Sequence, residues 1–372
     1  MQPQTLTVRQ LNRATLARQM LLERQKIPVV EAVERLGGMQ AQEPKPPFLG
    51  LWTRLEGFGP ESLLRRLRDR QVVRATLMRA TLHLMSARDY AAVRTSLQPM
   101  LEQGMSVLGA RADGLELDRV LAAARRLLEE ARDFSALRAA LAELFPHVNE
   151  RALGYAVRLH LPLVMVPTSD RWGFPRSADF ALAERWLDDP LSDDESPRAL
   201  ATRYLAAFGP ASAADFQAWS GLRGVKTVLD GMRDDLVTFR DERGRELLDL
   251  SDAPRPEPDV PAPPRLLPEF DSLVLAHADR TRIVADEHKG ALVTKNLRVR
   301  ATFLSNGFVR GTWTAERKRK IATIHLTPFE ALPQGAVAEL AAEGEALLRF
   351  AEPEATTFEV KIAEPAASAA VP

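Results

Sequence analysis

Apolar side chains recur at helical spacing through most of the first hundred residues and then alternate. Each of four segments places apolar residues three or four apart, which predicts four helices: residues 7–24, 28–36, 47–55 and 60–70. Residues 72–85 are rich in β-branched side chains that alternate, so we predict a pair of strands there, followed by a helix over residues 86–102. Helices followed by two strands are the pattern of a winged helix-turn-helix unit.

The same order of elements recurs twice. Predicted helices over residues 117–131, 134–144 and 149–159 precede a hairpin over residues 163–174. Predicted helices at 196–208, 212–220 and 224–233 precede a second hairpin over residues 236–250. Helices that each need a partner face are expected to stack into a curved scaffold, although the three segments show no repetition of sequence.

A proline-rich stretch separates these three segments from the end of the chain. Beyond it we predict short strands at 272–275 and 291–293, a hairpin about an Asn306-Gly307 turn, a helix over 334–350 and a strand over 356–362. The predicted fold is therefore α+β and mostly helical. It has winged-helix units at 1–105, 106–192 and 193–252, a linker at 253–264, a C-terminal α/β domain at 265–365 with a basic β-hairpin, and a disordered tail at 366–372.

Composition excludes several classes of chemistry. The chain has no cysteine, which rules out disulfides, a thiol nucleophile and cysteine-ligated metal, and its six histidines are scattered singly. No apolar run reaches the eighteen or so residues of a membrane span, and the N-terminus has no signal-peptide pattern. We expect a cytoplasmic monomer without metal or cofactor, and no membrane partner.

The net charge is zero, but the charges are segregated along the chain. Residues 1–110 hold 16 basic and 9 acidic side chains, residues 111–260 hold 20 and 27, and residues 280–325 hold 11 and 3. Two basic regions around an acidic middle fit a DNA duplex gripped between them, with phosphate contacts that make affinity depend on salt. The alternative is that the regions merely balance one another's charge.

The most informative stretch follows the predicted helix at 28–36. Gly37-Gly38 ends that helix, and Pro44, Pro46 and Pro47 favour extended backbone before them. In an extended chain residues two apart point to one side, so Gln40 and Gln42 are expected to present two carboxamides to one space. The plain alternative is that both are polar loop residues that cap a helix.

Several short motifs in order resemble one known family. They are LTVRQLNRATLARQMLL, GGMQAQEP, PPFLGLWTRL and RATLMRATLHLMSARDY near the start, FGP with DFQAWSGL in the middle, and LPEFD with NGFVRGTW near the end. Together they resemble the winged-helix DNA glycosylases of the AlkZ/YcaQ-like family, from about Leu6 to about Phe350. The Gln-Ala-Gln form of the motif resembles the AlkZ branch, and the resemblance implies a C-shaped channel for double-stranded DNA.

The resemblance implies excision of N7-alkylguanine and unhooking of interstrand crosslinks, with Gln40 and Gln42 as catalytic residues. Glutamine cannot transfer a proton, but an N7-alkylated guanine is already cationic and leaves as a neutral base without a general acid. Two carboxamides can orient a water at the anomeric carbon and stabilise a cation-like transition state. Such an open site needs no deep nucleobase pocket around Gln40.

Three alternatives remain open at this stage. Glu43 is the nearest carboxylate and is a candidate general base, although an extended strand points it away from both glutamines. Lys45 is a candidate Schiff-base nucleophile, which would make the enzyme bifunctional. A transcriptional regulator without catalysis is the third reading, because glutamine can pair with adenine in a groove.

Candidate DNA contacts lie on the predicted strands of both basic regions. Arg74 and Arg79 are expected to meet phosphate, and His83 either approaches the lesion or donates to backbone. Near the C-terminus the candidate phosphate contacts are Arg310 and the run Arg317, Lys318, Arg319 and Lys320, for which a solvated turn is the alternative.

Overall fold

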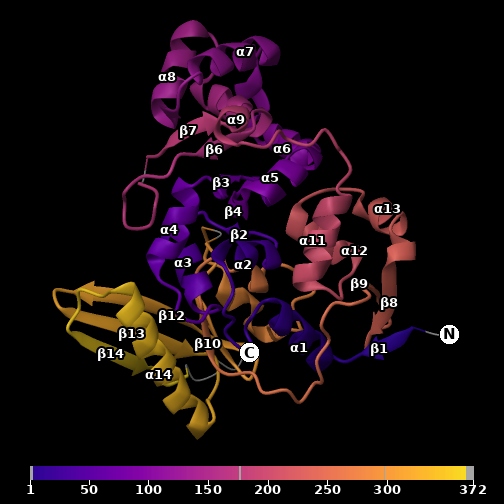
Figure 1. Ribbon diagram of the computed structural model, residues 1–372, viewed down its shortest axis with the longest axis vertical. Coiled ribbons are helices and arrows are strands. Elements are labelled where there is room, and N and C mark those ends of the chain that lie inside the picture. Colours follow the sequence, from indigo (N-terminus) through magenta and orange to yellow (C-terminus); the bar gives the residue numbers. More distant parts are fainter. Residues whose placement is uncertain (1–2, 176, 297, 366–372) are drawn as a thin grey trace, which may run out of the picture.

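A six-stranded sheet joins the first and second predicted units (Figure 1). The computed structural model describes residues 3–175, 177–296 and 298–365. Strand order in the sheet is β2-β4-β3-β6-β7-β5, with bounds β2 Met39–Gln40, β3 Val72–Thr76, β4 Leu82–Ser86, β5 Arg132–Asp133, β6 Leu163–Met165 and β7 Asp179–Leu182. The predicted strand pair is confirmed as β3 and β4, and Ala75 pairs with Val164 to connect the two hairpins into one sheet.

Three of the first four predicted helices begin within one residue of the predicted start, the one predicted at 47–55 begins at Lys45, and all four end earlier than predicted. Thr7 caps the first one in a capping box with Gln10, but that helix ends at Arg18 rather than Arg24, because Met20 takes a positive φ of 54°. Residues 104–112, at the predicted boundary between the first two units, form a 3₁₀ segment that buries Leu108. The bounds are α1 Val8–Arg18, α2 Val29–Arg35, α3 Lys45–Trp52, α4 Pro60–Arg68, η1 Met78–Ala80, α5 Ala87–Val93, η2 Thr95–Leu97, α6 Gln98–Gln103 and η3 Gly104–Ala112.

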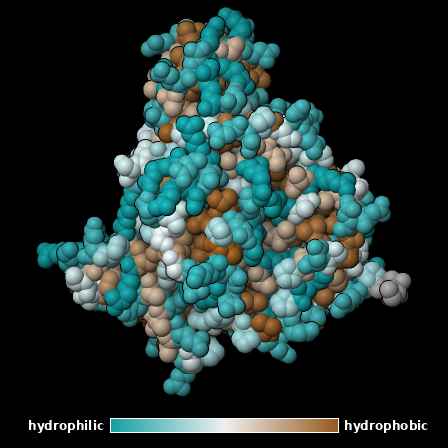
Figure 2. Space-filling model, in the orientation of Figure 1, coloured by the Kyte–Doolittle hydropathy of each residue, from teal (hydrophilic) through white to brown (hydrophobic). Residues whose placement is uncertain are grey.

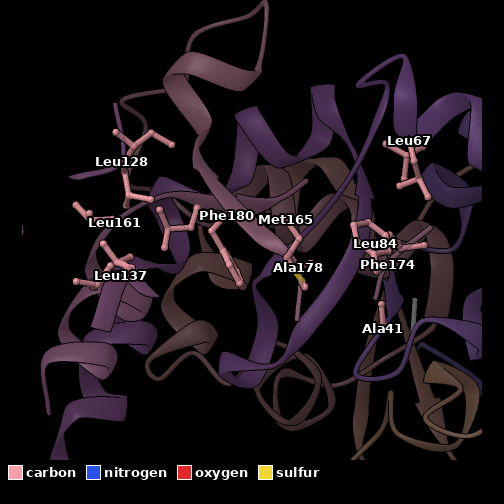
Figure 3. Packing of buried hydrophobic residues seen from close by; sticks show 14 of the residues in the cluster. Ala41, Leu67, Leu84, Leu128, Leu137, Leu161, Met165, Phe174, Ala178 and Phe180 are labelled. Atoms are coloured by element: carbon pink, nitrogen blue, oxygen red, sulfur yellow. The ribbon is translucent and has the colours of Figure 1, made fainter. Parts of the chain in front are cut away.

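The second unit confirms three predicted helices and corrects the predicted hairpin. α7 spans Leu117–Leu127, α8 Phe134–Leu144 and α9 Glu150–His160. β6 pairs with β7 rather than with residues 171–174. The apolar side chains of that segment mimic a strand but pack elsewhere, since Trp172 lies edge-on to Phe48 with ring centroids 5.0 Å apart. Figure 3 shows the shared core, which runs from Leu128 and Leu137 to Ala41.

The third unit follows the predicted order of helices and hairpin. Its elements are α10 Ala183–Trp186, α11 Arg198–Phe208, α12 Ala213–Ser220, α13 Val225–Asp230, η4 Arg233–Asp235, β8 Leu236–Asp241 and β9 Glu246–Leu250. β1, Gln4–Leu6, adds to β8 in parallel, so the N-terminus completes this sheet. Tandem winged-helix units and a C-shaped arrangement stay predictions.

The proline-rich stretch is fastened to α1. Prolines leave backbone carbonyls without partners from a ladder, and three arginines of α1 donate to them. Arg9 Nε lies 2.8 Å from the Pro258 oxygen, Arg13 Nε 2.7 Å from that of Val260, and Arg18 Nε 3.3 Å from that of Pro254. The stretch therefore runs as a strap across the first helix.

A five-stranded sheet follows, in the order β10-β11-β12-β13-β14, with α14 against it (Figure 1). The bounds are β10 Arg265–Leu267, β11 Thr302–Ser305, β12 Phe308–Lys318, β13 Ile321–Pro328, α14 Gln334–Ala351 and β14 Thr357–Ile362. The Asn306-Gly307 turn is confirmed, with both residues at positive φ. The short strands predicted near 272 and 291 are wrong, because those segments form 3₁₀ turns η5 Ser272–Val274 and η6 Asp286–Leu292.

The remaining observations concern membrane-spanning helices, the C-terminal tail and the surface. In the described part of the chain no helix combines the length and the apolar character needed to cross a bilayer. The tail predicted at 366–372 lies outside the described residues. Figure 2 shows a mostly hydrophilic face with hydrophobic side chains gathered near its centre, over the region of β2 and α2.

Candidate active site at the edge of the central sheet

Gln40 stands at the end of the edge strand β2 and is 9% exposed. The chain reaches it through Gly37 and Gly38, whose φ angles of 67° and 85° end α2 as the sequence predicts. A side chain on Gly38 would lie 3.1 Å from the Leu84 oxygen, so only glycine lets β2 approach β4 this closely. Local sequence therefore fixes where Gln40 sits.

Arg79 holds the Gln40 carboxamide in place. Arg79 Nη2 donates to Gln40 Oε1 at 2.8 Å, and Arg79 Nη1 donates to the Trp219 carbonyl near the end of α12. Burial, with Arg280 as a lesser cause, lowers the pKa of Arg79 to about 10, so its guanidinium is still charged at neutral pH. Arg79 thus connects Gln40 to the third helical unit and is not free for a DNA phosphate in this structure.

His83 lies beside Gln40 on the same face of the sheet, because the two residues are cross-strand partners. Its Nδ1 lies 3.0 Å from the Thr81 carbonyl oxygen, which can only accept, so Nδ1 carries the proton. Burial lowers the pKa of His83 to about 3, with the charge of Arg79 as a second cause. The ring is therefore neutral and buried, and of the two expected roles its Nδ1–H takes the one of donor to backbone. Nε2 has no partner among the described residues.

Gln42 does not share a cavity with Gln40. The chain bends over residues 42–44, and Pro44 adopts helical φ and ψ, so the expected extended backbone ends at Ala41. Gln42 is exposed and lines a cavity of about 580 Å³ with Leu82, Met165 and Phe180. Strand alternation puts those three side chains on the face opposite Gln40. The two glutamines thus line different cavities in this structure, and the joint action of their carboxamides on one sugar stays a prediction.

Arg74 stabilises the turn between the two glutamines instead of facing solvent. Its Nε donates to the Ala41 oxygen at 2.9 Å and its Nη2 to the Gln42 oxygen at 3.2 Å. The side chain is 3% exposed, and burial lowers its pKa to about 10. Arg74 therefore shapes the backbone that presents Gln42, and its predicted phosphate contact is not accessible.

A second, small space of about 20 Å³ lies beside Gln40. Its walls include the segment from Pro268 to Asp271, so two motifs more than two hundred residues apart meet here. Arg54, 1% exposed, fixes that segment with two bonds of 2.9 Å to Asp271. The space has both polar and apolar walls, and it has roughly the volume that one water molecule needs.

Two carboxylates line this space: Asp271, which Arg54 binds, and Glu269, which was not among the residues predicted from the sequence. Arg298 binds Glu269 at 2.6 Å and Glu43 at 3.3 Å, and Glu43 lines the large cavity with Gln42. One arginine therefore connects a carboxylate from each glutamine's cavity. The LPEFD motif that contains Glu269 was visible in the sequence, but its nearness to Gln40 depends on a contact between distant segments.

The predicted phosphate contacts near the C-terminus lie on β12 and the β12–β13 turn, and most of them have acidic partners. Arg310 pairs with Glu330, Arg317 with Glu352 and Glu354, and Lys318 with Glu316. Lys320 donates to the Glu354 carbonyl at 3.2 Å, and Arg319 is exposed at the turn with a φ of 57°. Their contact with DNA stays a prediction.

Lys45, the candidate nucleophile, donates to Glu352 at 3.0 Å, so its amine is part of an ion pair in this structure. Within residues 3–175, 177–296 and 298–365, no three histidine or acidic side chains group as metal ligands would.

Comparisons with known proteins agree with this architecture. The family of AlkZ-like DNA glycosylases matches residues 33–350. The solved structure of the DNA glycosylase AlkZ from Streptomyces sahachiroi superposes with a TM-score of 0.79 at 21% identity, covering 96% of this chain and 100% of that one. A comparison with curated protein sequences gives no match. The resemblance drawn from the sequence motifs is confirmed, and because the family match spans most of the chain, the protein is a DNA glycosylase that belongs to the AlkZ-like family.

Proposed function

We propose that the enzyme hydrolyses the N-glycosidic bond of cationic N7-alkylguanine in double-stranded DNA and releases the base from a monoadduct or a crosslink. One observation carries the proposal. Arg79 binds the Gln40 carboxamide, Gln40 lines a space with about the volume of a single water, and Glu269 lines the same space. This arrangement suits the orientation of one water molecule and does not suit the binding of a whole base.

The chemistry of the lesion explains why such a site suffices. An N7-alkylguanine carries a positive charge, so the pair of electrons of the breaking bond neutralises the departing base and no acid is needed. Positive charge develops on the sugar as the bond lengthens, and a water oxygen then attacks the anomeric carbon. A proton must leave that water after attack, and a carboxylate is the ordinary acceptor.

The residues divide these tasks. A carboxamide oxygen can accept two hydrogen bonds, and Arg79 uses one on Gln40, which leaves the second for the water. Glu269 supplies negative charge near the developing cation and accepts the proton. Gln42, whose Oε1 accepts from the Leu82 amide at 3.3 Å, approaches the sugar from the large cavity and supplies a second oriented dipole.

The small volume beside Gln40 also supports action on crosslinks. A base that is covalently tied to the opposite strand cannot easily be turned out into a closed pocket. About 20 Å³ is far less than a nucleobase occupies, so the lesion would be read where it lies in the duplex. The large cavity at Gln42 is the part of the site that could admit a base, and its charge is considered below.

Charge selectivity tests the proposal. Duplexes that each contain one 7-methylguanine, one uracil or one ethenoadenine are incubated with excess enzyme, and the released base is measured over time. We expect release of 7-methylguanine, with the two uncharged bases released at least a hundredfold more slowly. Equal release of charged and uncharged bases would overturn the proposal, since the site would then have to supply a general acid.

A further inference from the structure

The large cavity at Gln42 has an arginine-rich wall that the sequence analysis did not identify. Arg138 of α8 and Arg151 and Arg158 of α9 line it, opposite Gln42 and Arg74. Glu43 is the one acidic residue among the described lining residues, and it already contacts Arg298. Among the described residues, four arginines and one carboxylate therefore line a space of about 580 Å³.

Arg158 is the least compensated of these cations. Within the described part of the chain no carboxylate oxygen lies within 4.0 Å of its guanidinium, and its buried Nε has no hydrogen-bond partner. The guanidinium stacks 4.5 Å from the Phe134 ring centroid, which fixes its position without neutralising its charge. Burial lowers the pKa of Arg158, which reflects the cost of holding this charge away from water.

The charges of Arg138 and Arg151 are also incompletely compensated. Arg138 has a carboxylate partner, Glu150, at 3.5 Å, but its buried Nε is unpartnered. Arg151 donates to the Tyr155 hydroxyl at 3.4 Å, and no described carboxylate lies within 4.0 Å of it. Like charges gathered in one cavity repel, so an anion that enters would relieve the repulsion and supply the missing acceptors.

The nature of the lesion decides between two possible occupants. A cationic N7-alkylguanine turned into this cavity would meet three arginines and gain nothing from them. A backbone phosphate carries a negative charge and two unesterified oxygens that can accept hydrogen bonds from these guanidinium groups. We propose that Arg138, Arg151 and Arg158 form a clamp for one DNA phosphate of the strand that carries the lesion, on the Gln42 side of the site. The proposal rests on DNA as the substrate and does not require that N7-alkylguanine be the lesion.

Salt dependence of binding to an undamaged duplex tests the clamp independently of catalysis. The logarithm of affinity is measured against the logarithm of salt concentration for the wild type, Arg151→Gln/Arg158→Gln, and Arg126→Gln. Arg126 is an exposed arginine of α7 that does not line the cavity. For the double variant we expect roughly tenfold weaker binding at low salt and a slope smaller by about one, as for the loss of one phosphate contact. The Arg126→Gln control should keep the wild-type slope.

Two further measurements separate the clamp from a structural role and place it on the DNA. The double variant loses two uncompensated cations, so its Tm should stay at or above the wild-type value. Lysine in place of Arg158 (Arg158→Lys) should retain part of the salt slope that glutamine at this position removes. A duplex with one neutral methylphosphonate near a central lesion should weaken wild-type binding at one linkage and leave the double variant unaffected there.

Three outcomes would overturn the clamp. An unchanged slope in a stable double variant would show that no phosphate binds there. A loss confined to duplexes with a lesion would identify a base pocket instead. A rise in wild-type Tm with inorganic phosphate at constant ionic strength, without any change of slope, would identify a site for free phosphate. Failure of 7-methylguanine release in the wild type would leave the salt experiment intact, so the two proposals can fail separately.

Discussion

Gln40 is buried at the edge of the six-stranded sheet with its oxygen bound by Arg79, whereas Gln42, two residues later, is exposed and lines a cavity of about 580 Å³. The charged groups around them differ as well. On the Gln40 side, Arg54 forms an ion pair with Asp271. On the Gln42 side, Arg158 has no carboxylate partner among the described residues. The two halves of one motif are therefore built for different purposes.

The difference indicates what each side contributes. Satisfied, buried partners around Gln40 give fixed orientation, which catalysis by oriented dipoles requires. Unsatisfied cations and open space around Gln42 give a surface that is completed only when DNA binds. The five expectations below test this contrast, beginning with the largest effect.

Breaking the buried pair on the Gln40 side should cost the most. Asp271→Ala leaves the Arg54 guanidinium, 1% exposed, without its carboxylate, and removal of one partner of such a pair costs about 3–5 kcal/mol of unfolding free energy. Urea unfolding followed by circular dichroism measures the loss. A loss below about 1 kcal/mol would mean that water reaches Arg54 and that the Gln40 side is not rigid.

Removal of the Gln40 carboxamide should affect the chemical step and not binding. For Gln40→Ala we expect single-turnover release of 7-methylguanine to slow by about 10²–10³-fold, as for the loss of one oriented dipole at a transition state. Affinity for the damaged duplex should stay within about twofold of the wild type. A parallel fall of affinity and rate would instead make Gln40 a DNA contact.

Arg79 is a positioning residue in this account, and Arg79→Lys tests that role. Lysine keeps the charge but lacks the fork that reaches both Gln40 and the Trp219 carbonyl. We expect release to slow on the order of tenfold to a hundredfold with unchanged salt dependence of binding. A smaller salt slope with normal release would show that Arg79 contacts phosphate, as its sequence position first indicated.

The pH dependence of the unfolding free energy measures how completely water is excluded from His83 on the Gln40 side. Its pKa falls from 6.5 unfolded to about 3 folded, so between these values only the unfolded chain is protonated and stability is lost as pH falls below about 6.5. Lowering the pH from 7 to 5 should cost about 2 kcal/mol through His83. The variant His83→Asn should show that much less pH dependence in urea unfolding, and an identical dependence in both proteins would place His83 in contact with water.

Gln42→Ala should have the smallest effect. Gln42 is exposed and its oxygen makes one long bond to the Leu82 amide, so its loss should slow 7-methylguanine release by about tenfold, the value of one ordinary hydrogen bond. A loss as large as that of Gln40→Ala would erase the functional difference between the two sides.

Much of the local structure followed from the sequence. The glycine pair that ends α2, the Asn306-Gly307 turn and the helices α8, α9 and α11 were predicted because spacing, caps and turn residues act over a few neighbours. The family resemblance also rested on such short motifs. Each of these signals is complete within about a dozen residues.

What the sequence did not predict depends on contacts between distant segments. The bridge between Ala75 and Val164 joins two hairpins into one sheet, and after the bend that follows Ala41 the chain brings Gln42 to the large cavity lined by α8 and α9. Arg79 looks like a surface cation until α12 is placed beside it, and Glu269 approaches Gln40 only through the Arg54–Asp271 pair. Trp172 was taken for part of a strand because burial in a loop and burial in a sheet favour the same residue types.

The most direct test of the account compares release of 7-methylguanine from duplex DNA by the wild type, by Gln40→Ala and by the double variant Gln40→Ala/Gln42→Ala, with affinity measured for each. We predict that the wild type releases the base and that all three bind with similar affinity. The double variant should be about tenfold slower than Gln40→Ala, since the two carboxamides line different cavities and the effects of losing them should add. Wild-type protein that binds the duplex and releases nothing, or a Gln40→Ala variant as fast as the wild type, would contradict the account.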